Sequence, residues 1–306
     1  MGCGGPSFAL VYLTLLIFSV TAYGLNNVLI GHMARSHDLL WVVTARGVFL
    51  GMIMLPLLLV ADRQALQGDI LLSVLPFLAL ACVAALGANL CQTFAVRHLP
   101  MAIAVAIGQA LAALATLLLE LSVGNGMPHM AELLAVSGVV AGVVILGWIS
   151  GRDQPRVASA KPLWGVAAAA GFAICMASAL VPLGVVSRSA DPFFAAWGWE
   201  AGIGLCGLLA LSLRQWHRPR PIMPPRIMLK VGLCASPTVI GTGAYTYATT
   251  LGSITVAGGV LSAMMVATAI FARILFREML RPSQWMAIAA TCTCLVLLGL
   301  AQRWWG

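Results

Sequence analysis

The stretch QTFAVRHLP at residues 92–100 has a counterpart 153 residues further along the chain, YTYATTLGS at residues 245–253. Both contain a Thr-aromatic-Ala element, and Thr93 falls on Thr246 under this shift. The shift is half the length of the 306-residue chain. A similarity at such a long period indicates that the chain was built from two copies of one plan.

The composition places this chain in a membrane. Apolar residues make up 61% of it and charged residues only 8%, whereas about a quarter of an ordinary soluble protein is charged. Only helices and closed barrels satisfy their backbone hydrogen bonds in lipid, and the alternating pattern of barrel strands is missing from the sequence. We therefore predict an all-α membrane protein.

Apolar runs of about 20 residues, the length needed to cross a bilayer, occur ten times. The predicted transmembrane helices are Phe8–Gly31, Leu39–Ala61, Leu71–Val96, Met101–Leu121, Ala131–Ile149, Leu163–Val186, Pro192–Leu213, Ile227–Thr249, Thr255–Phe276 and Gln284–Gln302.

The order and spacing of these spans agree between the two halves of the chain. Asp38 before the second span falls on Asp191 before the seventh, and Gly51 falls on Gly204. Each half holds five helices, so the second half must enter the membrane from the opposite side. We predict ten transmembrane helices as two inverted five-helix repeats, with repeats at residues 1–150 and 163–306 and a linker at 151–162. Inverted repeats are typical of secondary transporters.

The basic residues behind the net charge of +8 are distributed unevenly between the loops on the two sides of the predicted membrane. Twelve basic residues fall in the odd-numbered loops and three on the other side of the predicted membrane. By the positive-inside rule this favours odd-numbered loops in the cytoplasm and both termini outside. The distribution argues against a nucleic-acid partner, and we expect a multi-pass plasma-membrane protein, in bacteria an inner-membrane protein, with lipid around it.

The chain resembles the drug/metabolite transporter superfamily, in its ten-helix branch built from two EamA-type domains. Arg46 in LLWVVTARGVFLG matches the family's habitual Arg on the second span. The stretch GGVLSAMMVATAIFARILFREMLRPSQWMAIAATCTCLVLLG resembles the family's long helix, Glu-bearing turn and final helix, with Glu278 at the family's Glu. The resemblance implies export or exchange of amino acids, other metabolites or drugs.

Two features depart from the family pattern. The turn of the first half reads SVGNGMPHM and lacks the Glu. Many relatives have both termini in the cytoplasm, whereas the loop charges here favour the reverse. Both departures limit how much detail the resemblance carries.

Polar groups deep in the spans are the candidate functional residues, because in lipid they must pair or face a cavity. Arg46 and Glu200 occupy nearly equivalent places in the two halves; they either face a shared cavity or form a buried ion pair. Aromatic residues could stack on a solute ring or simply pack. The predicted substrate-binding residues are Tyr23, Asn27, Arg46, Gln92, Gln109, Trp199, Glu200, Tyr245 and Ser262.

The sequence favours a transporter over an enzyme. No Walker-type Gly-x-x-x-x-Gly-Lys loop is present, and no span carries paired carboxylates or a Ser and His pair. Seven of the eight cysteines lie in apolar spans without metal-binding spacing, so we expect no metal and no cofactor.

We predict a secondary-active transporter, an exporter or exchanger, that moves a small organic solute such as an amino acid or related metabolite by alternating access around a central cavity. A zwitterionic amino acid, a nucleoside-like metabolite and a cationic drug all suit the candidate residues. Coupling would come from a proton, for which Glu200 is the deepest carboxylate, or from a counter-substrate. A channel or a membrane scaffold is the alternative.

Overall fold

The computed structural model describes residues 6–62, 67–122, 138, 141–142, 145, 161–217, 222–251, 257, 260–261, 263–277 and 280–305. Helices account for nearly all of this part of the chain, and no strand occurs within it. The predicted fifth span, 131–149, lies outside the described residues apart from four isolated positions. The described helices are α1 (Pro6–Ser36), α2 (Leu39–Ile53), the short 3₁₀ helix η1 (Leu55–Leu59), α3 (Gly68–His98), α4 (Met101–Ser122), α6 (Pro162–Ser189), α7 (Pro192–His217), α8 (Pro225–Ala235), α9 (Pro237–Leu251), α11 (Met264–Phe276) and α12 (Pro282–Trp305).

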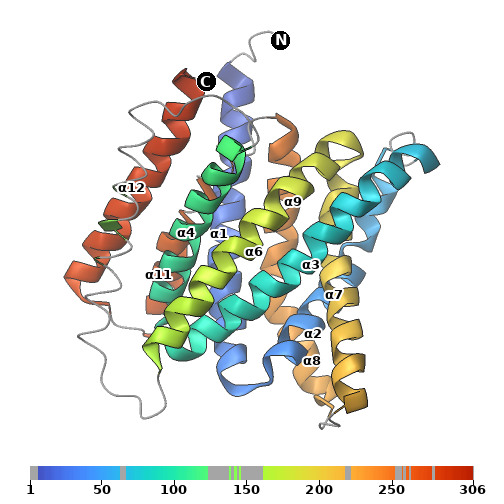
Figure 1. Ribbon diagram of the computed structural model, residues 1–306, viewed down its shortest axis with the longest axis horizontal. Helices are drawn as coiled ribbons and strands as arrows, with labels where there is room; N and C mark the ends of the chain where they lie inside the picture. The colour runs from blue at the N-terminus through green and yellow to red at the C-terminus, as the bar shows by residue number, and fades with distance from the viewer. Residues whose placement is uncertain are drawn as a thin grey trace.

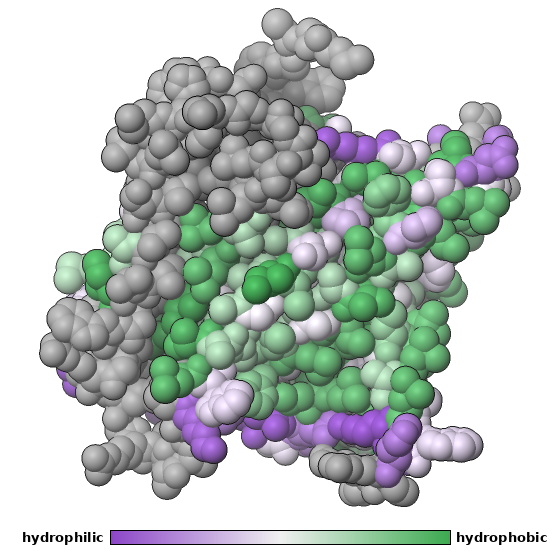
Figure 2. All heavy atoms as spheres, in the orientation of Figure 1, coloured by the Kyte–Doolittle hydropathy of each residue, from purple (hydrophilic) through white to green (hydrophobic). Residues whose placement is uncertain are grey.

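Five of these helices are long and apolar enough to cross a membrane, and a sixth span is formed if α8 and α9 count together. Apolar side chains cover the middle of the molecule in Figure 2, and hydrophilic ones gather at two opposite edges. An apolar belt between two polar edges is what a membrane-spanning bundle presents to lipid.

Proline marks the point where two of the predicted spans change direction or helix type. The eighth span was predicted as one helix, but it bends by 42° between α8 and α9, where Ser236 forms a turn before Pro237. Proline has no N–H group to donate and clashes with the preceding turn, so it commonly starts a new helix. The second span likewise changes at Met54 from α2 into η1, with Pro56 in the first turn of η1.

The helices pack in pairs that are exchanged between the two halves. As Figure 1 shows, α3 of the first repeat and α6 of the second run side by side across the front of the bundle. Under the 153-residue shift the corresponding helices are α9 and α1, and these also pack on each other. Similarly, α4 packs on α6 and α11 packs on α1. Two further contacts, α2 with α7 and α4 with α11, join equivalent helices directly. This is the pattern of two repeats related by a pseudo-two-fold axis, and it agrees with the predicted inverted duplication.

Two helix backbones come very close where α2 crosses α7. A Cβ atom on Gly47 would lie 2.5 Å from the backbone nitrogen of Gly204, and one on Gly207 would lie 2.4 Å from the hydroxyl of Thr44. Small residues at such positions allow two helix backbones to come into contact. The equivalent helices α2 and α7 therefore pack closely through their glycines.

Hydrogen bonds at the helix ends follow the same symmetry. The Arg35 Nε donates to the carbonyl of Val96 at 3.0 Å, and 153 residues later the Arg188 Nε donates to the carbonyl of Thr249 at 3.0 Å. The first bond ties the end of α1 to the end of α3. The second ties the end of α6 to the end of α9.

The cap residues Asp38 and Asp191 are also equivalent. Asp38 accepts from the backbone of Trp41 at the start of α2 and binds Arg214 from the end of α7. Asp191 accepts from the backbone at the start of α7 and from the backbone N–H of Asp62, which follows η1. The α2–α7 crossing is thus bridged at both of its ends.

Candidate functional site

A small cavity lies at the centre of the bundle, where both repeats meet. Its volume is about 40 Å³, enough for a few water molecules but far below the 300 Å³ or more of typical ligand pockets. The present arrangement is therefore a closed one. The lining residues are Tyr23, Asn26, Asn27, Arg46, Asn89, Gln92, Gln109, Phe172, Met176, Trp199, Leu261 and Met264.

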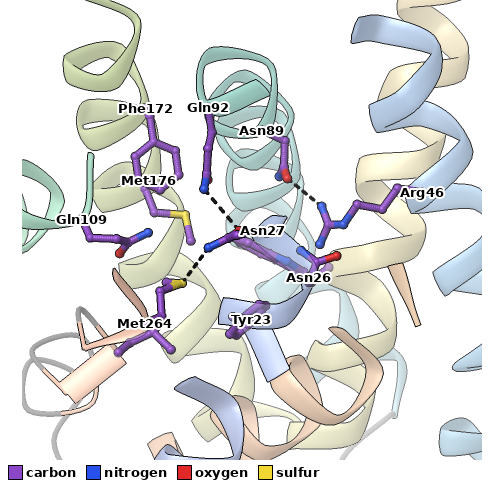
Figure 3. Close-up of a pocket in the computed structure, with 12 residues that line it drawn as sticks. Tyr23, Asn26, Asn27, Arg46, Asn89, Gln92, Gln109, Phe172, Met176 and Met264 are labelled. Atoms are coloured by element: carbon purple, nitrogen blue, oxygen red, sulfur yellow. Dashed lines mark hydrogen bonds between the residues drawn. The ribbon is translucent and has the colours of Figure 1, made fainter. Parts of the chain in front are cut away.

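The first repeat supplies the polar wall, which includes five carboxamide side chains. Gln92 on α3 donates to the Asn27 carbonyl oxygen on α1 at 3.2 Å, and the Asn27 amide donates to the sulfur of Met264 at 3.2 Å (Figure 3). Asn89, one helical turn before Gln92, accepts from Arg46 at 2.7 Å. These hydrogen bonds therefore link α3 to α1 through Gln92 and Asn27, and α3 to α2 through Asn89 and Arg46.

Arg46 and Glu200 form an ion pair next to this wall, with 3.1 Å between Arg46 Nη2 and Glu200 Oε1. The exposed fractions of the two side chains are 5% and 0%, so both charges are removed from solvent. A buried charge without a partner costs several kcal/mol, and this pairing satisfies both of them. Arg46 lines the cavity, whereas Glu200 lies behind it.

A chain of hydrogen bonds extends from this pair into α9 and α1. Thr242 donates to Glu200 Oε1 at 3.0 Å, and the Tyr23 hydroxyl lies 2.8 Å from the Thr242 oxygen. Because the single hydroxyl proton of Thr242 goes to Glu200, Tyr23 must donate to Thr242. Asn89 and Thr242 are equivalent under the 153-residue shift, so each member of the ion pair is bound by the same position of the two repeats.

The second repeat supplies the apolar wall. All five of its lining residues are aromatic, aliphatic or thioether side chains: Phe172, Met176, Trp199, Leu261 and Met264. The seven lining residues of the first repeat are all polar. The cavity is therefore divided by polarity along the boundary between the repeats, although the fold around it is nearly symmetric.

Several polar groups in the lining have no hydrogen-bond partner among the described residues. They are the carbonyl oxygen of Asn26 and the Nε of Arg46, both of which are buried. Gln109 is 5% exposed, and none of the hydrogen bonds found within the described part of the chain involves its side chain. Buried polar groups normally have a partner, so these three groups are available to a solute or to water.

A second small cavity of about 20 Å³ continues from the first between α1 and α3. The two cavities share Asn26, Asn27, Asn89 and Gln92. The second cavity reaches Val96, whose carbonyl accepts a hydrogen bond from Arg35 at the end of α1. The two cavities together form a path from the centre of the bundle toward the ends of α1 and α3.

This path ends under two arginine side chains. Arg35 donates to the carbonyls of Val96 and Leu99, and Arg97 donates in return to the carbonyls of Ala34 and His37. These four bonds join the ends of α1 and α3, and we call the pair Arg35 and Arg97 the arginine clamp.

The corresponding region of the second repeat is filled. Leu180, Leu183 and Tyr245 occupy positions equivalent to Asn27, Ile30 and Gln92, and each is at most 7% exposed. The two membrane faces are thus closed to different depths.

The structure brings six of the nine predicted site residues together in the cavity: Tyr23, Asn27, Arg46, Gln92, Gln109 and Trp199. Glu200 lies behind Arg46, and Tyr245 is 1% exposed in the core and is not among the lining residues. Ser262 lies outside the described residues. Whether any of these residues binds a solute stays a prediction.

The predicted set did not include Asn26, Asn89 or four of the five residues of the apolar wall. Asn89 could have been found, because it lies three residues before Gln92 and therefore on the same face of one helix. Phe172, Met176, Leu261 and Met264 carry no such signal, since apolar residues on a membrane helix look alike whether they face lipid, a core or a cavity.

Comparison with protein families gives two matches along the chain, at residues 10–148 and 163–300, both to the EamA-like transporter family. The chain belongs to this family. The two EamA regions correspond to the two halves that exchange helices around the central cavity. This confirms the resemblance seen in the sequence and makes the chain a multi-pass membrane transporter of the drug/metabolite type.

The fold of this EamA chain recurs among solved structures, of which 28 chains match. One, described only as the crystal structure of a protein, superposes with a TM-score of 0.66 at 16% identity and covers 99% of this chain and 100% of its own. At that identity the likeness concerns the fold alone. No curated protein matches the chain.

Proposed function

We propose that this EamA-family chain is a secondary-active exporter or exchanger of a small organic solute, of the size of an amino acid or a related metabolite. The observation that carries the proposal is the central cavity, which is built from both repeats and adjoins the buried Arg46–Glu200 pair. A site between two pseudo-symmetric halves can be opened to either face by moving one half against the other. Alternating access is the mechanism that such a site supports best.

The unequal closure of the two faces supports this mechanism. Toward one face the second cavity extends as far as Gly31 and Val96, and Val96 accepts from the arginine clamp, whereas Leu183 and Tyr245 are buried in the equivalent region of the other repeat. In the exchanged state we expect the α6–α9 region to loosen while the α1–α3 region packs. Symmetric repeats make such an exchange of roles possible at little net cost.

Coupling to a proton or to a counter-substrate would act through Glu200. Its Oε1 accepts from Arg46 and Thr242, while its buried Oε2 has no partner among the described residues. A proton taken up by this carboxyl group would cancel its charge and weaken the ion pair that joins α2 to α7. We propose that this weakening links protonation or solute exchange to the movement of α2 against α7.

Counterflow in proteoliposomes tests the proposal. Vesicles preloaded with one pool of amino acids or metabolites are given the labelled compound outside, and the wild type is compared with Glu200→Gln and Arg46→Ala. We expect saturable uptake that depends on preloading, and its loss in both variants. The matched control is Arg214→Ala, which breaks the partly exposed pair with Asp38 outside the cavity and should keep transport. Uptake that is independent of preloading and linear in concentration would favour a channel.

A further inference from the structure

The cavity has one polar wall and one apolar wall, and it contains almost no uncompensated charge. From this we infer that the solute is uncharged, with a planar amide-type hydrogen-bonding edge and a flat apolar or aromatic portion, as in a nucleoside base. The inference rests on the proposed function, whose solute it specifies. It separates three solute classes that the sequence leaves open: neutral nucleoside-like compounds, zwitterionic amino acids and cationic drugs.

The charges of the lining exclude the charged classes. Arg46 is the one charged residue among the described lining residues, and no carboxylate is among them. An ammonium group in the cavity would therefore lack a counter-ion. A carboxylate would approach an arginine that Glu200 already neutralises at 3.1 Å. The desolvation free energy of a charged group in this cavity therefore exceeds the free energy gained from pairing, and a zwitterion carries two such groups.

The unpartnered groups of the lining fit a neutral amide. The buried Asn26 carbonyl oxygen accepts, the buried Arg46 Nε donates, and the Gln109 carboxamide does both. A carboxamide side chain binds bidentately to a neighbouring donor and acceptor, as Asn and Gln do with adenine. Solutes that carry such an adjacent donor and acceptor would satisfy these groups without bringing charge.

The opposite wall fits a flat apolar group. Phe172 and Trp199 offer aromatic faces, and the Met176 and Met264 sulfurs can contact the edge of a ring. In Figure 3, Met176, Met264, Phe172 and Gln109 stand at one end of the cavity and Arg46 enters from the other. A solute would therefore lie with its ring against the methionines and its polar edge toward the unpartnered groups of the lining, Gln109 among them.

Binding requires the cavity to widen from about 40 Å³. The methionines are the side chains best suited to move, because each has three flexible torsions and adapts its shape at small cost. The single bond from Asn27 to Met264 would be exchanged for bonds to the solute.

A set of four ligands with one ring and different charges tests the inference. Isothermal titration of the purified full-length protein is made with 3-phenylpropanamide, 3-phenylpropanoate, 2-phenylethylammonium and phenylalanine. The neutral amide should bind at least ~10-fold more tightly than each of the others, which corresponds to about 1.4 kcal/mol. Affinities within about threefold of one another, including no measurable binding of all four, would overturn the inference, as would a preference for any charged member.

Variants of Gln109 make the test specific to the cavity, because removing its side chain breaks no bond found within the described residues. Gln109→Leu should lower the affinity for the amide about 10-fold, and Gln109→Glu should shift the preference to 2-phenylethylammonium, since it places a carboxylate in the lining. The matched control is Gln67→Glu, an exposed position before α3, which should leave the order unchanged. An unchanged preference in Gln109→Glu would contradict the assignment.

Counterflow separates this inference from the proposed function. Adenosine crosses membranes slowly and carries a neutral base edge, so it should exchange saturably in preloaded vesicles while phenylalanine does not. If phenylalanine exchanges saturably instead, the transporter stands and the solute class is wrong. If the neutral amide binds most tightly but no solute exchanges, the solute class stands and the transport function is wrong.

Discussion

The guanidinium of Arg46 lies 3.1 Å from the carboxylate of Glu200, at the crossing of the two helices on the pseudo-symmetry axis. Arg46 also binds Asn89, and Glu200 also binds Thr242. Asn89 and Thr242 occupy equivalent positions in the two repeats. The ion pair therefore joins the halves at the point about which they are related. Any relative movement of the halves must change its geometry.

The first prediction concerns the stability of this pair. Arg46→Ala leaves a fully buried carboxylate unpaired and should lower the free energy of unfolding by about 3–5 kcal/mol. The double variant Arg46→Met/Glu200→Met removes both charges and should recover most of that loss, because apolar side chains of similar size can replace a buried pair. Thermal unfolding in detergent measures both. A double variant as unstable as the single one would contradict the pairing.

The same double variant separates folding from function. If the pair takes part in transport, the protein should be folded and inactive in counterflow. Full transport by a folded Arg46→Met/Glu200→Met protein would show that the pair is only structural.

The second prediction concerns the α2–α7 crossing. Gly47→Ala places a Cβ atom 2.5 Å from the backbone of Gly204 and should destabilise the protein by about 2–3 kcal/mol, since neither helix backbone can yield without moving. The matched control is Gly243→Ala in α9, where no atom lies within 4 Å of the added Cβ. That control should gain about 0.5–1 kcal/mol, because alanine favours a helix interior over glycine. Equal melting temperatures for the two variants would argue against the close crossing.

The third prediction concerns the arginine clamp, Arg35 and Arg97. Replacing both with Gln should loosen the ends of α1 and α3 and expose the cavity between them. A Thr93→Cys probe in that cavity, in a chain whose native cysteines are replaced by alanine, should then react about 10-fold faster with a water-soluble thiol reagent. Arg188→Gln, at the equivalent place in the second repeat, should leave the rate unchanged. A rate that rises equally in all variants would mean general loosening.

The fourth prediction concerns the internal amide network. Asn27→Leu keeps the side-chain volume but breaks the bond from Gln92 and the bond to Met264. Because Gln92 is half-buried and can turn to water, the stability should fall by only about 1 kcal/mol. Solute binding should fall more than stability does. A loss of several kcal/mol without an effect on binding would show that the amides serve packing.

The duplication could be predicted from the sequence because equivalent residues keep the same spacing. The shift of 153 residues that relates Thr93 to Thr246 also relates Arg35 to Arg188, whose identical bonds to helix-end carbonyls were not foreseen. The bend at Pro237 was missed because hydropathy alone does not register a break inside an apolar run.

The candidate site was predictable where it is polar. Polar side chains in lipid-spanning segments are rare and conspicuous, and Asn27, Gln92 and Gln109 all line the cavity. Tyr245 is the repeat partner of Gln92, but it is buried in the core and is not among the lining residues of the cavity, because the two repeats do not contribute alike. The apolar wall depends on which face of α6 and α11 turns inward, and that is decided by tertiary packing.

The central claim is that one cavity is reached alternately from both membrane faces. The most direct measurement is the reaction of a cavity cysteine, Met176→Cys in the cysteine-replaced chain, with a membrane-impermeant thiol reagent in right-side-out and in inverted vesicles. We expect labelling from either side. A condition that speeds labelling from one side should slow labelling from the other. Labelling from a single side under all conditions, or from both sides independently, would contradict alternating access.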